Sequence, residues 1–368
     1  MLGALAGGLA TLWHWVVAAL VFGFLILVHE LGHFIAARRE GVRVERFSVG
    51  FGPAVAKWRA RGVQWRIGAI PVGGYVALSG EEEGKGEPDE FCSKGPGARS
   101  RVIVAGVLMN ALAALLALWA AGVVGFEAAG CDVVEIIGEP AKEAGLEVGD
   151  VVTAVDGRSV RTSSELQQAI MFSKEPTVAL SVLRDGAAVE LAAHPMVKHG
   201  YPDRLYEVLG EEVEYRYVGI AIGGGLVRVR YGPLAASGVA LRTAGHYAAI
   251  TYKVLWRLVT LRLSIPKAEL MGPVGIAVVT SRAAAFGLGA VLQLAGIISL
   301  ALALFNVLPI PLLDGGHLAF LAWEGVFGRP VPARVKQVSQ QVSFMLILAL
   351  GVVVTFYDIL RIWAGGGT

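Results

Sequence analysis

Two histidines and a glutamate lie close together in the sequence His29-Glu30-Leu31-Gly32-His33, inside a long apolar stretch. On a helix, residues four apart share one face, so both imidazoles can bind one Zn²⁺ ion at about 2.0–2.1 Å. Glu30 lies beside that face, where it can take a proton from a zinc-acidified water and pass it to the leaving amine. The pattern therefore predicts a catalytic zinc site that hydrolyses peptide bonds.

The apolar surroundings of this motif strengthen the interpretation. Each ionisable group at the centre of a bilayer costs at least about 2.5–3.5 kcal/mol on insertion scales. Three such groups within five residues need a function that compensates for this cost. The alternative is a pair of hydrogen-bonded core histidines near the end of a helix.

A catalytic zinc site usually has a third protein ligand and one open position. Asp314, in the sequence NVLPIPLLDGG, is the acid closest to apolar sequence elsewhere in the chain. Pro309 and Pro311 break a helix there, and irregular backbone at membrane depth is tolerated only in protein or beside water. We expect Asp314 to be the third ligand of a single Zn²⁺; the alternative is a helix cap at the membrane surface.

The composition predicts a polytopic α-helical membrane protein. Of 368 residues, 55% are hydrophobic and 17% are charged, whereas a soluble domain has about 45–50% apolar residues. The net charge of +2 gives no reason to expect a nucleic-acid partner. Four stretches are long enough to cross a lipid bilayer as helices, at about 12–37, 102–126, 290–313 and 342–362.

The distribution of Lys and Arg predicts the orientation of these spans. Basic residues follow the first span, precede the second, and lie between the third and fourth, namely Arg38, Arg39, Arg43, Arg46, Arg99, Arg101, Arg329, Arg334 and Lys336. These loops should be cytoplasmic. Both termini and the segment 127–289 should lie outside the cytoplasm, with Arg361 as a single exception.

Two regions between the spans have their own patterns. Residues 44–76 are rich in Gly, aromatic and β-branched residues, and polar and apolar residues alternate in VQWRIGAI (63–70). With the Gly and Pro punctuation, this predicts a hairpin-like, membrane-associated β region; acidic residues 81–97 should be a flexible tether. Residues 131–229 should form a soluble domain, with a short helix at 141–146, a strand at 150–155 and a helix near Glu165 capped by Ser163 or Ser164. The core AGLEVGDVVTAVDG resembles a PDZ domain, a fold that binds extended peptides at a sheet edge; the alternative is a small β-rich spacer.

The chain therefore divides into six predicted regions. They are the first span with its metal motif (1–40), the β region and tether (41–101), the second span (102–127), one PDZ-like domain (128–229), an amphipathic helical linker (230–285) and the last two spans (286–368). The helical linker is expected either at the membrane surface or against the outer domain.

Taken together, these motifs resemble the bacterial site-2 proteases, specifically the regulator of sigma-E protease group. The motifs that carry this resemblance are spread over nearly the whole chain: HELGH, GFGP (50–53), IPVGGYV (70–76), the PDZ-like core, RYGPLAA (230–236), MGPVGIA (271–277) and NVLPIPLLDGG. Two features depart from the pattern: AGVLMN (105–110) lacks a proline that often follows its glycine, and only one PDZ-like unit is evident.

The resemblance implies a zinc protease of the bacterial inner membrane that cuts single-span membrane proteins within the bilayer. Its substrates would be anti-sigma factors already shortened by an upstream site-1-type protease, or signal-peptide remnants. It implies His29, His33 and Asp314 as zinc ligands and Glu30 as the catalytic acid and base. Asn306 and Pro309, with Gly73 and Gly74 of the β region, match positions that hold the unwound substrate.

Two other classes of function remain open on the residues alone. A non-catalytic membrane scaffold would use the PDZ-like domain to bind partners, but it would have no need of Glu30. A metal transporter would need polar groups spread along a path through several spans, whereas here they gather at one depth.

Overall fold

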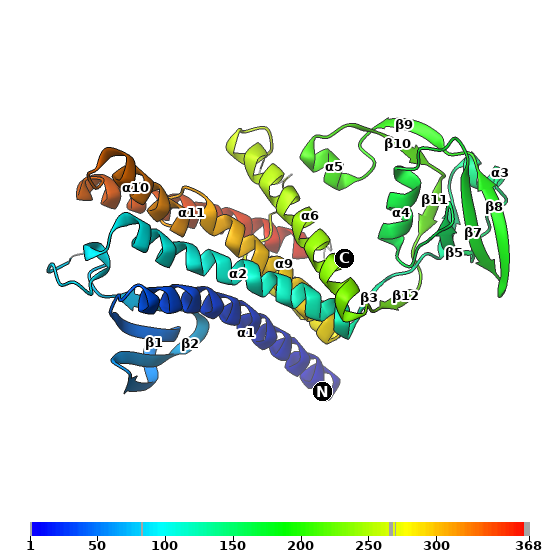
Figure 1. The fold of residues 1–368 in the computed structure, drawn as a ribbon. Coiled ribbons are helices and arrows are strands. Elements are labelled where there is room, and N and C mark those ends of the chain that lie inside the picture. Colours follow the sequence, from blue (N-terminus) through cyan, green and yellow to red (C-terminus); the bar gives the residue numbers. More distant parts are fainter. Residues whose placement is uncertain (1, 82–83, 265–267, 269, 364–368) are drawn as a thin grey trace. The chain divides into compact units, whose positions relative to one another are not determined.

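The computed structural model describes residues 2–81, 84–264, 268 and 270–363, and the chain divides into two compact units (Figure 1). The helical unit comprises Met1–Ala121, Pro233–Tyr252 and Glu269–Thr368. The β-rich unit comprises Gly122–Gly232 and Lys253–Ala268. The remaining residues, including Met1 and 364–368 at the termini, lie outside the described part of the chain.

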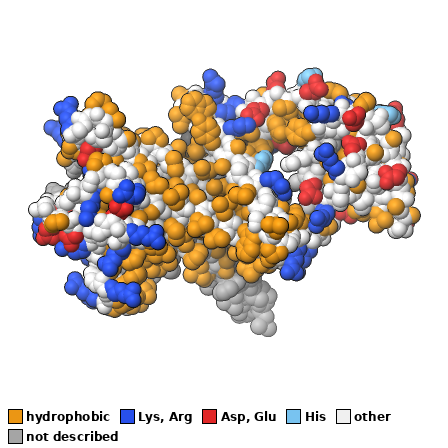
Figure 2. Space-filling model, viewed as in Figure 1, with side chains coloured by type: hydrophobic (Ala, Val, Ile, Leu, Met, Phe, Trp, Pro, Cys, Tyr) orange, Lys and Arg blue, Asp and Glu red, His pale blue; other side chains and the backbone are white. Residues whose placement is uncertain are grey.

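Four helices in the described residues are long and apolar enough to cross a membrane. They are α1 (Leu2–Arg39, with the candidate span Trp15–Arg39), α2 (Pro96–Val124), α9 (Leu288–Val307) and α11 (Ala333–Trp363). The prediction of four helices that are long and apolar enough to span a membrane is therefore confirmed. Hydrophobic side chains gather over these helices, as Figure 2 shows.

Small residues allow these helices to approach closely. A Cβ atom on Gly296 of α9 would lie only 2.7 Å from Leu118 Cγ of α2. Ala240 and Ala244 of α6 (Pro233–Val259) join the same buried cluster. Without a hydrophobic driving force between helices in lipid, such close contacts are a main source of association.

The third span ends earlier than its hydropathy predicts. We expected a helix to residue 313, but α9 ends at Val307, and Pro309 and Pro311 follow in irregular backbone. A further helix, α10 (Asp314–Phe327), then begins in what we predicted as a loop. The linker before α9 also contains a short apolar helix, α8 (Pro273–Ala285).

The β region is a curled antiparallel sheet built from β1 (Val44–Ala60) and β2 (Val63–Leu78). The first half of β1 pairs with both ends of β2: Phe47 is opposite Trp65 on one side and Val76 on the other. The second half of β1 pairs only with the start of β2, as in Trp58 opposite Trp65. The end of β2 therefore forms one edge of a meander, which agrees with the predicted hairpin-like sheet.

The segment between this sheet and α2 is not the free tether that we predicted. Backbone hydrogen bonds join Arg43 N to Asp89 O and Phe91 N to Ser79 O. Glu90 is buried, and its Oε2 atom accepts a hydrogen bond from Gly86 N at 2.9 Å. Acidic, Gly-rich composition indicated flexibility, but it could not reveal these contacts with β1 and β2.

The β-rich unit contains a four-stranded antiparallel sheet in the order β6-β5-β7-β8, and three strand pairs, β11-β4, β12-β3 and β10-β9. Its strands are β3 (Phe126–Ala129), β4 (Val133–Ile136), β5 (Val151–Val155), β6 (Arg158–Ser159), β7 (Val178–Arg184), β8 (Ala187–Ala193), β9 (Met196–Gly200), β10 (Val213–Tyr217), β11 (Ile220–Ile222) and β12 (Leu226–Val229). Its helices are α3 (Glu139–Glu143), α4 (Ser163–Met171) and α5 (Arg204–Leu209).

Local signals in this unit were mostly interpreted correctly. The predicted strand at 150–155 is present as β5, and Asp156 and Gly157, both with positive φ, form the turn to β6. Helix α4 begins where expected, but its cap is Thr162, whose side chain accepts a hydrogen bond from Glu165 N at 3.2 Å. The assignment of the cap to Ser163 or Ser164 was wrong because these residues already have helical positions.

Candidate metal centre

Helix α1 presents both histidines of the HELGH motif on one face, one turn apart. His29 and His33 are each 8% exposed. Helix α2 lies directly against them, because a Cβ atom on Gly106 would overlap the His33 ring and lie 2.9 Å from His29 Cε1. Gly32 likewise allows α1 to touch the backbone of Ala105. The two glycines therefore determine how closely α2 covers the imidazoles.

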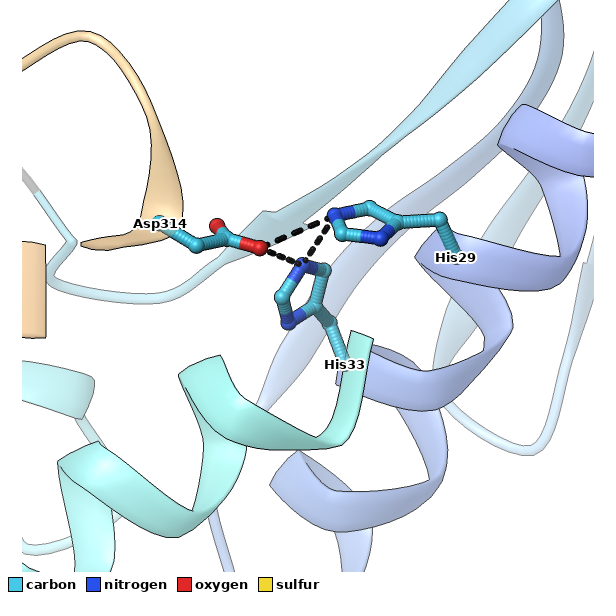
Figure 3. Close-up of side chains that lie close together, drawn as sticks. All are labelled: His29, His33 and Asp314. Atoms are coloured by element: carbon cyan, nitrogen blue, oxygen red, sulfur yellow. Dashed lines mark hydrogen bonds and ion pairs between the residues drawn. The ribbon is translucent and has the colours of Figure 1, made fainter. Parts of the chain in front are cut away.

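Asp314 reaches the same place from the start of α10 (Figure 3). The preceding residues fold back tightly: a Cβ atom on Gly315 or Gly316 would overlap the carbonyl oxygens of Val307 or Ile310. This close approach explains the two glycines of LDGG. Asp314 makes no capping hydrogen bond for α10, since its carboxylate points toward the imidazoles instead, so the alternative of a simple helix cap is not supported.

Three possible ligand atoms converge on one point, all within 4.8 Å of one another. Asp314 Oδ2 lies 3.0 Å from His29 Nε2 and 3.5 Å from His33 Nε2, and the two Nε2 atoms are 3.1 Å apart. Ligands at about 2.0–2.1 Å from a tetrahedral ion are about 3.3–3.4 Å from one another. Asp314 Oδ2 is buried without a hydrogen bond from the described residues, so the set fits a zinc ion.

The outer nitrogen of each imidazole is also engaged. His33 Nδ1 donates to Val102 O at 2.9 Å, which leaves the Nε2 lone pair free. The side-chain nitrogen of Asn110 lies 3.3 Å from His29 Nδ1, while Asn110 Oδ1 has no described partner. A half-turn of this amide places Oδ1 to accept the Nδ1 proton, which frees Nε2 for a metal. Ser299 Oγ donates to Asn110 O at 2.8 Å and ties α9 to the same point.

Glu30 connects α1 to the edge of the β1–β2 sheet. Its Oε2 atom accepts a hydrogen bond from Val76 N at 3.0 Å. Glu30 and the three possible metal ligands line one cavity of about 400 Å³. The acid predicted as the base thus shares a cavity with the predicted ligands.

The four residues predicted to hold substrate have different surroundings. Asn306 lines the cavity, whereas Pro309 is exposed and is not among its lining residues. Gly73 and Gly74 are buried in the sheet, where a Cβ atom would lie 2.6 Å from Phe51 Cε2 or from Ser48 O, respectively. The structure therefore gives these two glycines a packing role.

The residues of the cavity wall that sequence reasoning missed include Tyr75, Val76 and Asn110. His317 also lines the cavity. Asn110 carried a usable signal, because a polar side chain within an apolar span marks a functional interior. Tyr75 and Val76 carried none, since their place depends on which edge of the sheet faces α1.

Comparison with known proteins gives one consistent family. Residues 17–350 match the model of Peptidase family M50. The chain is 33% identical over 362 residues to "Putative zinc metalloprotease Atu1380" of Agrobacterium fabrum, covering 92% of this chain and 94% of that protein. Proteins described in the same words match from Campylobacter jejuni (30% identical, 93% and 92% covered) and from Nostoc (32% identical, 91% and 93% covered). The chain belongs to Peptidase family M50, the site-2 proteases, and is a membrane zinc metalloendopeptidase.

Proposed function

We propose that His29, His33 and Asp314 bind one Zn²⁺ ion and that Glu30 is the catalytic acid and base. The observation that carries this proposal is the convergence of two Nε2 atoms and one carboxylate oxygen at 3.0–3.5 Å, with Glu30 in the same cavity. Membership in a peptidase family favours this enzyme over a non-catalytic scaffold.

The chain's own residues would manage the proton. When bound, the zinc ion supplies Lewis acidity to the peptide carbonyl and to water. The Glu30 carboxylate accepts a proton from the attacking water. It then donates this proton to the amide nitrogen as the C–N bond breaks. Part of the cavity wall is buried, including His29, His33 and Asn110, and the lower local dielectric there strengthens each of these electrostatic interactions.

We further propose that the cut bond lies in a transmembrane segment that has locally unwound. Backbone amides in a helix are already hydrogen-bonded, so a protease needs an extended stretch. The end of β2 forms an edge of the sheet beside Glu30. The backbone groups of Val76 point away from β1 at this edge, and those of Gly74, two residues earlier, point to the same side. A substrate strand added there would reach the cavity, with Asn306 on the wall and Pro309 nearby in the chain.

The proposed substrates are single-span membrane proteins, either anti-sigma factors shortened by an upstream site-1-type protease or remnants of signal peptides. Cleavage would form one step of regulated intramembrane proteolysis. The support is the family resemblance together with the site's place among four membrane-length helices. The proposed location is the bacterial inner membrane. We place the β1–β2 sheet in the cytoplasm, and both termini and the β-rich unit outside it, because Lys and Arg cluster in the loops that flank the sheet.

For the β-rich unit we propose a PDZ-like role in selecting substrates. A groove of about 330 Å³ lies between α4 and the segment from Tyr215 to Ile222, lined in part by Gln167, Ile170 and Gly219. It would either bind a newly exposed C-terminus or exclude bulky outer domains by size. Cleavage of untrimmed substrates after deletion of 131–229 would support exclusion, and unchanged selectivity would contradict both roles.

The test of the catalytic proposal is cleavage of a tagged single-span substrate in detergent, at equal bound zinc. Glu30→Gln should retain the metal and lose about 10²–10⁴-fold in cleavage rate, the contribution typical of general acid–base catalysis. Glu143→Gln, the same change at an exposed position of the β-rich unit, should cleave at the wild-type rate. Equal cleavage by Glu30→Gln would overturn the assignment of the active site.

A further inference from the structure

A second cavity, of about 730 Å³, lies between the last turns of α1 and the turn that joins β1 to β2. Three guanidinium groups line it: Arg38 and Arg39 from α1, and Arg61 from the turn. The rest of its wall is mainly apolar, with Phe34, Trp58 and Trp65 among the lining residues. None of these residues contributes a ligand atom to the zinc site.

The three arginines differ from their basic neighbours in having no acidic partner among the described residues. Arg43 pairs with Glu87 at 2.6 Å and with Asp89 at 3.3 Å, and Arg101 pairs with Glu40 at 2.7 Å. In contrast, no ion pair in the described part of the chain involves Arg38, Arg39 or Arg61. The cavity therefore carries concentrated positive charge that an anion would neutralise.

Aromatic rings form the apolar side of the cavity. The rings of Trp58 and Trp65 are stacked, with centroids 6.4 Å apart and an interplanar angle of 11°. Phe34 of α1 packs against Trp65 at 5.5 Å, which joins the sheet to the helix. Trp58 remains 48% exposed. Partly exposed tryptophans beside arginines are typical of the boundary between lipid and water.

The position of the cavity along α1 agrees with such a boundary. The candidate span ends at Arg39, so Arg38 and Arg39 lie at its last turn. Arg61 occupies a left-handed position, φ 52°, in a two-residue turn where Gly, Asn or Asp is usual. The turn thereby brings a third cation toward the end of the span. Lys and Arg side chains gather over this end of the helical unit in Figure 2.

We propose that this cavity binds the headgroup phosphate of an anionic phospholipid. Arg38, Arg39 and Arg61 would donate hydrogen bonds to the phosphate oxygens, a geometry that guanidinium groups favour. The acyl chains would run along the apolar face of α1 near Phe34 and Ile35. A lipid fits better than a free phosphate, because the wall opposite the cations is aromatic and lies at the end of a membrane span.

The experiment compares lipid retention by the full-length protein in detergent, measured by native mass spectrometry with added phosphatidylglycerol or phosphatidylcholine. Wild type should retain phosphatidylglycerol about tenfold or more in preference to phosphatidylcholine. The variant Arg38→Gln/Arg39→Gln/Arg61→Gln should lose that preference. A matched control, Arg329→Gln/Arg334→Gln/Lys336→Gln, removes the same charge from another loop and should keep it.

A second measurement does not depend on the folding of the triple variant. Brominated phosphatidylglycerol should quench the Trp58 contribution to fluorescence, defined by subtracting the spectrum of Trp58→Phe, and brominated phosphatidylcholine should not. Three outcomes would each overturn the proposal. They are an equal loss of lipid preference in both triple variants, equal quenching by the two brominated lipids, and displacement of phosphatidylglycerol by millimolar inorganic phosphate. The last outcome would indicate a site for small phosphate ions.

Discussion

Two aspartates, one in each unit of the molecule, have opposite surroundings. Asp150 in the β-rich unit is 1% exposed and fully satisfied: Arg184 donates to its two oxygens at 2.7 and 2.8 Å, and Glu147 N donates at 2.9 Å. Asp314 in the helical unit faces two imidazole nitrogens, and its buried Oδ2 accepts no hydrogen bond from the described residues. Asp150 is saturated by hydrogen bonds within the protein, as expected for a structural role, whereas Asp314 keeps an oxygen free, as the proposed zinc site requires.

The largest expected effect is the loss of zinc from the proposed site at Asp314. Asp314→Asn should weaken zinc binding by more than about 10³-fold, beyond the 10- to 100-fold typical of residues outside the coordination shell. The unfolding temperature of the metal-free protein should fall little, because the carboxylate contacts only the two imidazoles, at 3.0 and 3.5 Å, and the amide can replace those contacts. Competition with a chelator of known affinity measures the zinc affinity. An affinity equal to that of wild type would contradict the proposed difference between Asp314 and Asp150.

The reverse result is expected at the satisfied site. Asp150→Asn should leave zinc affinity unchanged and reduce the stability of the β-rich unit by about 2–4 kcal/mol, because Arg184 then loses a buried charged partner. Hydrogen exchange of the β5 and β7 amides in the full chain reports this stability. Protection equal to that of wild type would show that the Arg184 contact contributes little.

A smaller effect is expected at Asn110, which supports His29 without lying among the possible ligands. Asn110→Ala should weaken zinc binding by about 10–100-fold, or about 1.4–2.7 kcal/mol. Asn110→Asp keeps an oxygen that accepts the Nδ1 proton and should restore most of the affinity. Failure of Asn110→Asp to exceed Asn110→Ala would indicate a packing role instead.

The smallest effect concerns pH. Hydrogen bonding from Arg184 lowers the pKa of Asp150, so the unfolded state binds the proton more readily than the folded state. The resulting stability is complete above the ordinary Asp pKa of about 3.9 and is lost as pH falls through the lower pKa of the folded state. Hydrogen-exchange rates of the β5 amides, corrected for the pH dependence of intrinsic exchange, should show this loss of stability in wild type. The loss should be smaller in Asp150→Asn.

The sequence was most informative where chemistry and spacing coincide. HELGH on an apolar helix predicted two imidazoles on one face, and LDGG supplied the acid closest to apolar sequence elsewhere in the chain, so the site's three convergent residues were named in advance. Asn110 and Gly106 were not, because their roles depend on which face of α2 meets α1. Helix α10 was missed because its first turn contains two glycines, which lower helix propensity but permit the fold-back onto Val307.

The hydrogen bond between Val76 N and Glu30 Oε2 sets a condition on the order of events in catalysis. That amide has one proton, and it can serve either the carboxylate or the carbonyl of a strand added to the sheet. If a substrate strand pairs at Val76 as proposed, it must displace Glu30 from this amide, so the contact that positions the substrate also frees the proposed base. This coupling would prevent cleavage of membrane proteins that enter the cavity without pairing with the edge of β2.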